Sequence, residues 1–139
     1  MQVGVRCQVF PTEDKNRILS ALANFFPEKN TEYRFENSIV LMNTGKRESL
    51  DIIRNAIHSS RIIDAVRSSV LRNLIGLETR ILADKQAAFS GRFRLVDDRE
   101  EEPPLGSVEI SISFANDEEL EAFLRWFVPP TKNGRIVLD

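Results

Sequence analysis

The sequence predicts an α+β fold in which a single, largely antiparallel sheet is covered by about three helices. Apolar and polar residues alternate at 2–10 and at 108–114, which is the pattern of half-buried strands. Apolar residues recur at helical spacing between and after these segments. The chain has 139 residues, of which 42% are hydrophobic and 29% charged, and we expect residues 1–139 to form a single domain.

The part of the chain before residue 45 is expected to form two structural pairs, a strand with a helix and then two short strands. The predicted elements are a strand at 2–10, a helix around 18–26, and strands at 33–35 and 39–41. Thr12 is expected to cap the helix, with Glu13 and Asp14 in the first turn, where the helix dipole favours acidic residues. Pro27 ends this helix, and Asn37 marks the hinge between the two short strands.

The remainder of the chain is expected to alternate between helices and strands. The predicted elements are a helical region at 50–74, strands at 77–83, 92–96 and 108–114, and a helix at 120–127. The Ser59-Ser60 pair marks a break within the helical region, and Gly76 fits a helix C-cap. Asn116 and Glu119 have the spacing of a capping box at the start of the last helix.

Charge is distributed unevenly along a chain whose net charge is only −2. Residues 46–94 contain ten basic and five acidic side chains, which gives +5. Residues 95–121 contain one basic and ten acidic side chains, which gives −9. The chain is therefore polarised along its length, and the basic segment is the natural place to look for an anionic partner.

Four arginines of the basic segment form a pattern that suits phosphate recognition. On an ideal helix Arg61 and Arg72 point within about 20° of one direction, opposite the apolar stripe. Arg92 and Arg94 lie two residues apart on one face of the strand predicted at 92–96. Guanidinium groups in this arrangement can bind phosphates. An ordinary solvated helix face has the same pattern, so both interpretations stay open.

Two other basic side chains are expected to stabilise the fold. Arg67 projects from the flank of the apolar stripe, three residues after Asp64, which favours a structural ion pair over a phosphate contact. Truncating Arg67 should therefore cost stability more than binding. His58, the only histidine, has no Ser, Cys or carboxylate in a triad pattern, so we expect a satisfied or exposed imidazole.

The sequence contains no recognisable catalytic, metal or cofactor site. The Gly45-Lys46 pair is followed by Arg47, where a phosphate-binding loop requires Ser or Thr. The lone Cys7 excludes an intramolecular disulfide and a cysteine-based zinc site, and we expect it to be buried on a strand. The acidic run at 97–102 lacks the spacing of a calcium loop. Because the expected nucleophile, metal ligands and acid–base pair are missing, we predict that the protein is not an enzyme. No apolar run approaches the roughly 20 residues of a membrane span, so we also predict a cytoplasmic protein.

Five pieces of the sequence resemble a small archaeal family of predicted RNA-binding proteins. They are VFPTED at 9–14, RIIDAVRSSVLR at 61–72, DKQAAFSGRFRL at 84–95, PLG at 104–106 and PPTKNG at 129–134. The resemblance implies a double-stranded-RNA-binding-like or ribosomal-protein-L5-like fold. A double-stranded-RNA-binding domain places a lysine-rich cluster at a helix start. The corresponding segment here, Lys85-Gln86-Ala87-Ala88, offers one lysine.

The leading functional hypothesis is non-catalytic binding of structured RNA by shape and charge. Its candidate contacts are Arg61, Arg72, Lys85, Arg92 and Arg94. The alternative is a protein-interaction module or homodimeric scaffold that does not bind nucleic acid. In that case the acidic region at 97–121 would meet a basic surface of the partner. Neither hypothesis requires a cofactor or a membrane, and they differ in whether the five basic side chains converge on an open surface.

Overall fold

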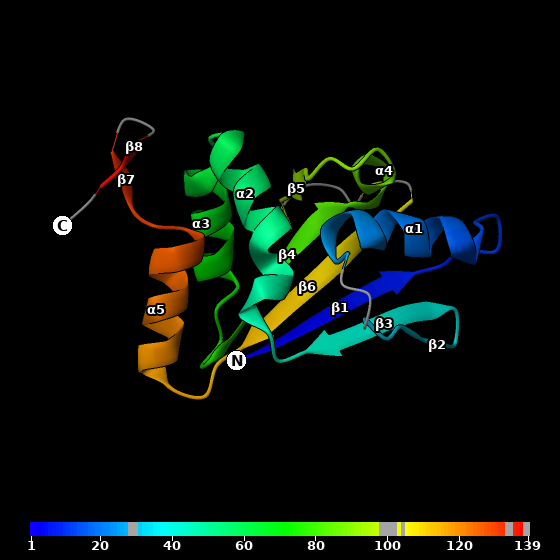
Figure 1. Ribbon diagram of the computed structural model, residues 1–139, viewed down its shortest axis with the longest axis horizontal. Coiled ribbons are helices and arrows are strands. Elements are labelled where there is room, and N and C mark those ends of the chain that lie inside the picture. The colour runs from blue at the N-terminus through cyan, green and yellow to red at the C-terminus, as the bar shows by residue number, and fades with distance from the viewer. Residues whose placement is uncertain (28–30, 98–102, 104, 133–134, 138–139) are drawn as a thin grey trace.

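The centre of the structure is a six-stranded antiparallel sheet. The computed structural model describes residues 1–27, 31–97, 103, 105–132 and 135–137. The strands are β1 (Gln2–Gln8), β2 (Arg34–Glu36), β3 (Ile39–Thr44), β4 (Glu78–Asp84), β5 (Leu95–Val96) and β6 (Ser107–Ser113). Their order across the sheet is β2-β3-β1-β6-β4-β5, so the N-terminal strand lies near the middle (Figure 1). The predicted α+β class with a largely antiparallel sheet is confirmed.

Five α-helices occur among the described residues, where the sequence predicted about three. They are α1 (Lys15–Phe25), α2 (Asp51–Ser59), α3 (Ile63–Arg72), α4 (Lys85–Phe89) and α5 (Asp117–Phe127), and a 3-10 turn at Arg47–Leu50 leads into α2. The predicted helical region divides after Ser59, where a break was expected. The additional helix, α4, occupies the connection between β4 and β5. It forms there because the Asp84 carboxylate accepts a hydrogen bond from the Gln86 amide at 3.0 Å and caps it.

The helices cover one face of the sheet and leave the other face open. Alternate residues of the three central strands are buried against the helices, and these are Val3, Val5 and Cys7, then Thr79, Ile81 and Ala83, then Val108, Ile110 and Ile112. They pack with Leu22 of α1, Ile57 of α2 and Val70 of α3 in one core. Arg6 and Glu109 lie side by side on the opposite face. The alternation predicted for the first and sixth strands is therefore confirmed, since it separates a core face from a polar one.

Two predicted boundary features are confirmed. Asn37 and Ser38 both take left-handed φ angles, of 50° and 64°, at the hinge between β2 and β3. Asn116 caps α5 by accepting the Glu119 amide at 2.9 Å. The Glu119 carboxylate in turn accepts from the Ala115 amide at 3.2 Å, which completes the reciprocal pattern one residue earlier than in the usual capping box.

Two predicted caps are wrong. Asp14, and not Thr12, caps α1, because its carboxylate accepts a hydrogen bond from the Asn16 amide at 2.9 Å. Gly76 does take a left-handed φ of 61°. It lies, however, in the turn between Ile75 and Glu78, since α3 already ends at Arg72. Both segments contain residue types that favour helix caps, but each helix begins or ends a few residues away from the predicted position.

The C-terminal end of α5 is held by three basic side chains from α2 and α3. The last carbonyls of a helix have no partner within it, and they form the negative end of its dipole. Three consecutive carbonyls here each accept a hydrogen bond from a basic side chain, in the pairs Arg54–Trp126 at 2.7 Å, His58–Phe127 at 2.8 Å and Arg67–Val128 at 3.0 Å. We call this arrangement the α5 clamp. The prediction of a satisfied histidine is confirmed, because its Nε2 carries the proton of this hydrogen bond.

Arg67 is structural, as predicted, but its partner is different. We expected an ion pair with Asp64 in the preceding turn of the same helix. The Arg67 guanidinium instead reaches the Val128 carbonyl, and Asp64 accepts a hydrogen bond from the Thr131 hydroxyl. Both residues therefore bind the chain that follows α5. No helix in the described part of the chain is long and apolar enough to cross a membrane.

Candidate nucleic-acid interface

A hollow of about 470 Å³ lies between the end of α2 and the segment that joins α4 to β5. Its walls include Ser59 and Ser60 at the end of α2, and Arg92 and Arg94 before β5. Both arginines are exposed. We call this feature the arginine hollow. Two of the five predicted contacts, Arg92 and Arg94, therefore line the hollow. A third, Arg61, directly follows the wall residue Ser60 in the chain.

Arg61 does not lie on α3, as the helical pattern predicted. It is in the turn between α2 and α3, with a left-handed φ of 58°, and it is exposed. A non-glycine residue in this conformation costs roughly 1–2 kcal/mol. Among the described residues no acidic side chain pairs with Arg61. A strained and unpaired arginine in an exposed turn is the kind of feature that functional sites retain.

Arg92 and Arg94 precede β5, which contains only Leu95 and Val96, so the predicted strand at 92–96 is shorter than expected. A turn presents them, because the Arg92 amide donates to the Ala87 carbonyl at 3.0 Å. Arg94 binds the Asp84 carboxylate at 3.1 Å but stays largely exposed. Arg92 has no acidic partner within the described part of the chain.

Arg72 lies away from the arginine hollow. It is the last residue of α3, and its guanidinium is 3.4 Å from the Asp97 carboxylate just beyond β5. The predicted line of Arg61 and Arg72 on one helix face does not form, because Arg61 precedes the helix. Arg72 could reach a ligand only by giving up or sharing its contact with Asp97.

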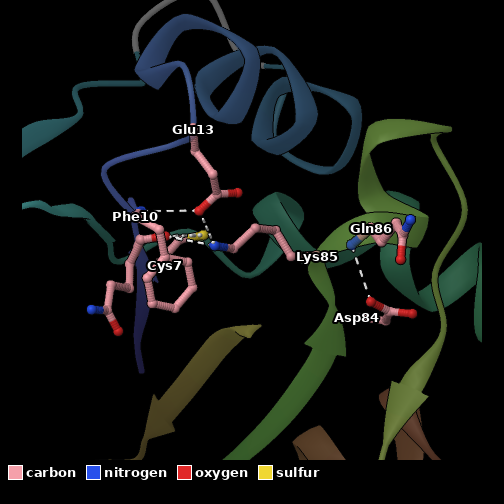
Figure 2. Close-up of polar contacts among 7 residues, drawn as sticks. Cys7, Phe10, Glu13, Asp84, Lys85 and Gln86 are labelled. Carbon is pink, nitrogen blue, oxygen red and sulfur yellow. Dashed lines mark hydrogen bonds and ion pairs between the residues drawn. The ribbon is translucent and has the colours of Figure 1, made fainter. Parts of the chain in front are cut away.

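Lys85 is buried, with only 1% of its surface exposed, although it is at a helix start as the resemblance implied. Figure 2 shows its side chain pointing from α4 into the interior, toward Glu13 and Phe10. The ammonium donates to the Gln8 carbonyl at 2.7 Å and to the Glu13 carboxylate at 2.9 Å. It also lies 4.8 Å from the centre of the Phe10 ring. An RNA phosphate cannot reach this ammonium in the folded protein, so Lys85 leaves the candidate contact set.

The buried ion pair joins two segments that carry the family resemblance. Glu13 belongs to the piece at 9–14 and Lys85 to the piece at 84–95. Glu13 also accepts from the Phe10 amide at 3.0 Å, while its second oxygen is buried without a partner among the described groups. Sequence reasoning missed this pair. The signal available was a lone lysine next to Ala87 and Ala88, whose small side chains are typical of a helix packed closely on its neighbours.

Cys7 lies beside this pair and is buried as predicted (Figure 2). Burial raises the pKa of its thiol to about 11, and the nearby positive charge of Lys85 only partly opposes this effect. Because the thiolate is the reactive form, we expect native Cys7 to resist alkylation at about pH 8 and to react fully after unfolding. Mass spectrometry of iodoacetamide-treated protein with and without urea measures this. Rapid labelling of the folded protein would contradict the buried position.

The arginine hollow is rich in hydrogen-bond donors, and the described residues that line it include no Cys, His, Asp or Glu. Guanidinium groups and serine hydroxyls are donors, which match phosphate oxygens. The one histidine is engaged in the α5 clamp. Within the described ranges, no group of three or more His, Cys, Asp or Glu side chains could hold a metal ion.

Comparisons with known proteins agree with the resemblance in the sequence. A family model described as RNA binding matches residues 2–114. A UPF0201 protein of Sulfurisphaera tokodaii is 32% identical over 96% of this chain and 90% of its own length. The crystal structure of an uncharacterised UPF0201 protein is 27% identical, with a TM-score of 0.78, over 99% of this chain and 100% of its own.

A second solved structure supports the fold alone. The UPF0201 protein from Methanococcus jannaschii is 24% identical and has a TM-score of 0.79, over 99% of this chain and 100% of its own. The ribosomal-protein-L5-like description stays a prediction. The family model, which matches most of the chain, and the relative of 32% identity together show that this protein belongs to the UPF0201 family, whose model is described as RNA binding.

Proposed function

We propose that this protein is a cytoplasmic, non-catalytic RNA-binding protein that grips the phosphates of structured RNA at the arginine hollow. The observation that supports the proposal is that Arg92 and Arg94 line the arginine hollow, while Arg61 directly follows Ser60 on its opposite wall. All three are exposed, and Arg61 and Arg92 have no acidic partner among the described residues. The family model described as RNA binding covers all three positions.

Recognition of backbone shape suits this surface better than stacking of single-stranded bases. Base stacking requires an open aromatic face. Among the described residues the exposed aromatic ring is Phe35, and the Lys15 ammonium lies 4.5 Å from its centre. Trp126 is half-buried, and the guanidinium groups of Arg47 and Arg54 lie 4.4 and 5.2 Å from its centre. Phe93 lines the hollow and packs edge-on against Phe25. We therefore favour a duplex or a folded RNA whose phosphates face the three arginines.

The proposal is tested by titrating structured RNA with the wild type and with the triple variant Arg61→Glu, Arg92→Glu, Arg94→Glu. We expect the wild type to bind saturably at about 50 mM salt and far more weakly at about 200 mM, since each phosphate contact on a duplex contributes about 0.9 to the log–log salt slope. The triple variant should lose saturable binding. The single variant Arg61→Gly should also bind more weakly while keeping or gaining stability, because glycine accepts the left-handed φ.

Arg6→Glu is the matched control, since Arg6 is exposed on the open face of the sheet. It makes the same change of charge as any one of the three substitutions, but at a distant surface, so it should weaken binding only slightly. No saturable binding by the wild type, or an equal loss in Arg6→Glu and the triple variant, would overturn the proposal. Light scattering on the same samples measures the oligomeric state and so tests the alternative. A dimer that does not bind RNA would favour the protein-interaction module.

A further inference from the structure

The chain ends in a small hairpin that stands apart from the main sheet (Figure 1). It consists of β7 (Thr131–Lys132) and β8 (Arg135–Ile136), which form a two-stranded sheet separate from the six-stranded one in the described part of the chain. A two-stranded hairpin this short is only marginally stable by itself. It also lies beyond residue 114, where the match to the family model ends. We therefore expect any role of the hairpin to depend on its own side chains.

The base of the hairpin is fixed firmly to the body of the protein. Val128 and Pro129 are buried, and the Val128 carbonyl is held in the α5 clamp. The Thr131 hydroxyl donates a hydrogen bond to Asp64 in the first turn of α3. The Val137 amide closes the hairpin by donating to the Pro130 carbonyl at 2.9 Å. Because Asp64 is only three residues after Arg61, the hairpin is attached at the helix start that follows the arginine hollow.

The hairpin places two cations directly opposite each other. Lys132 and Arg135 are cross-strand partners, and both are exposed. Like charges in this position destabilise a strand pair. Neither side chain pairs with an acidic group in the described part of the chain. An anion placed between them would remove this repulsion and gain two charge-assisted hydrogen bonds.

We propose that the hairpin is a second contact element for RNA, in which Lys132 and Arg135 bind backbone phosphates of the same molecule that occupies the arginine hollow. This inference rests on the proposed function and adds to it the kind of RNA that is bound. Two separate cationic elements on a rigid body can be bridged only by a ligand with several phosphates at fixed spacing. An RNA helix, the ligand of the proposed function, has phosphates so arranged, and a mononucleotide or inorganic phosphate should bind far more weakly.

The variant Lys132→Glu separates binding from structure. It replaces a like-charge cross-strand pair by an opposite-charge pair with Arg135, so the melting temperature should stay equal or rise. The same change removes one phosphate contact and engages the other cation internally. We expect the affinity for a short RNA duplex to fall about tenfold and the salt slope to fall by about 1 to 2. Fluorescence anisotropy of a labelled duplex and a thermal melt measure the two effects.

Arg34→Glu on the edge strand β2 serves as the charge-matched control, because Arg34 is well exposed and, among the described residues, its one ion pair is with Glu36 at 3.8 Å. A Lys132→Glu variant that binds duplex as tightly as the wild type, with the same slope, overturns the hairpin contact and leaves the arginine hollow intact. A wild type that binds no duplex overturns both proposals. If Lys132→Glu melts early, the double variant Lys132→Ala, Arg135→Ala replaces it, and unchanged affinity in that variant has the same meaning.

Discussion

Lys85→Met is expected to lower the free energy of unfolding by about 3–5 kcal/mol. The methionine side chain fills much of the same space, but it leaves the Glu13 carboxylate buried without a counter-charge. The same change removes both hydrogen bonds that the ammonium donates, one to the Gln8 carbonyl and one to the Glu13 carboxylate. Removing one member of a buried ion pair is costly because the remaining charge has given up its water. Urea unfolding followed by circular dichroism measures the loss.

The double variant Lys85→Met, Glu13→Gln identifies the source of this cost. With both charges removed, much of the lost stability should return, because no uncompensated charge remains. Lys132→Met, at an exposed position, is the control and should change stability by less than about 0.5 kcal/mol. A Lys85→Met variant as stable as the wild type would contradict the buried position of the ammonium. Lys85→Met and the double variant, where they remain folded, should bind RNA as the wild type does, because neither change touches the proposed contacts.

Arg54→Met combined with Arg67→Met should destabilise the protein by about 2–4 kcal/mol, because two carbonyls of the α5 clamp lose their charged donors. Hydrogen bonds to charged groups are worth about 1.5–3 kcal/mol each, and partial exposure of both arginines puts the expected value toward the lower end. Arg54 also lies over Trp126, so its removal uncovers part of that ring. Chemical unfolding measures the change.

Arg125→Met is the control for the α5 clamp. Arg125 lies in the last turn of α5 but is exposed, so its loss removes only a modest favourable interaction with the helix dipole. Equal losses in the Arg125 variant and the double variant would show that helix charge, and not the specific hydrogen bonds, stabilises this helix end. The unfolding slope should remain unchanged if the variants affect the native state alone.

Local patterns in the sequence predicted the local features of the fold. Strand alternation identified the core faces of β1 and β6, and the spacing of Asn116 and Glu119 identified the start of α5. These features depend on residues that are neighbours in the chain, so a single sequence contains the information. Arg92 and Arg94 were recognised from their two-residue spacing, although the strand expected to carry them begins only at Leu95.

Features that depend on distant segments could not be predicted in this way. The partner of Lys85 is Glu13, 72 residues earlier, and the pair forms only because the end of β1 meets the start of α4. The sequence alone does not show whether Lys85, the one lysine among the five candidate contacts, is buried or exposed. The partner of Arg67 is likewise a backbone carbonyl beyond α5, 61 residues later, and carbonyls leave no mark in a sequence. The conformation of Arg61 depends on how α2 and α3 pack together.

The position of β6 has a consequence for how the chain folds as it is synthesised. It is the last of the six strands in the sequence, yet it lies in the middle of the sheet between β1 and β4. Until it emerges, β1 with β3 and β4 with β5 are two separate partial sheets, and each has an unpaired edge. The sheet can therefore be completed only after β6 has emerged, and we expect this step to be slow, since the pairing of β1 with β6 joins segments about 100 residues apart in the sequence. A nascent chain that has emerged from the ribosome as far as β5, but not yet β6, would expose two partial sheets with unpaired edges, and we expect this stage to be vulnerable to aggregation.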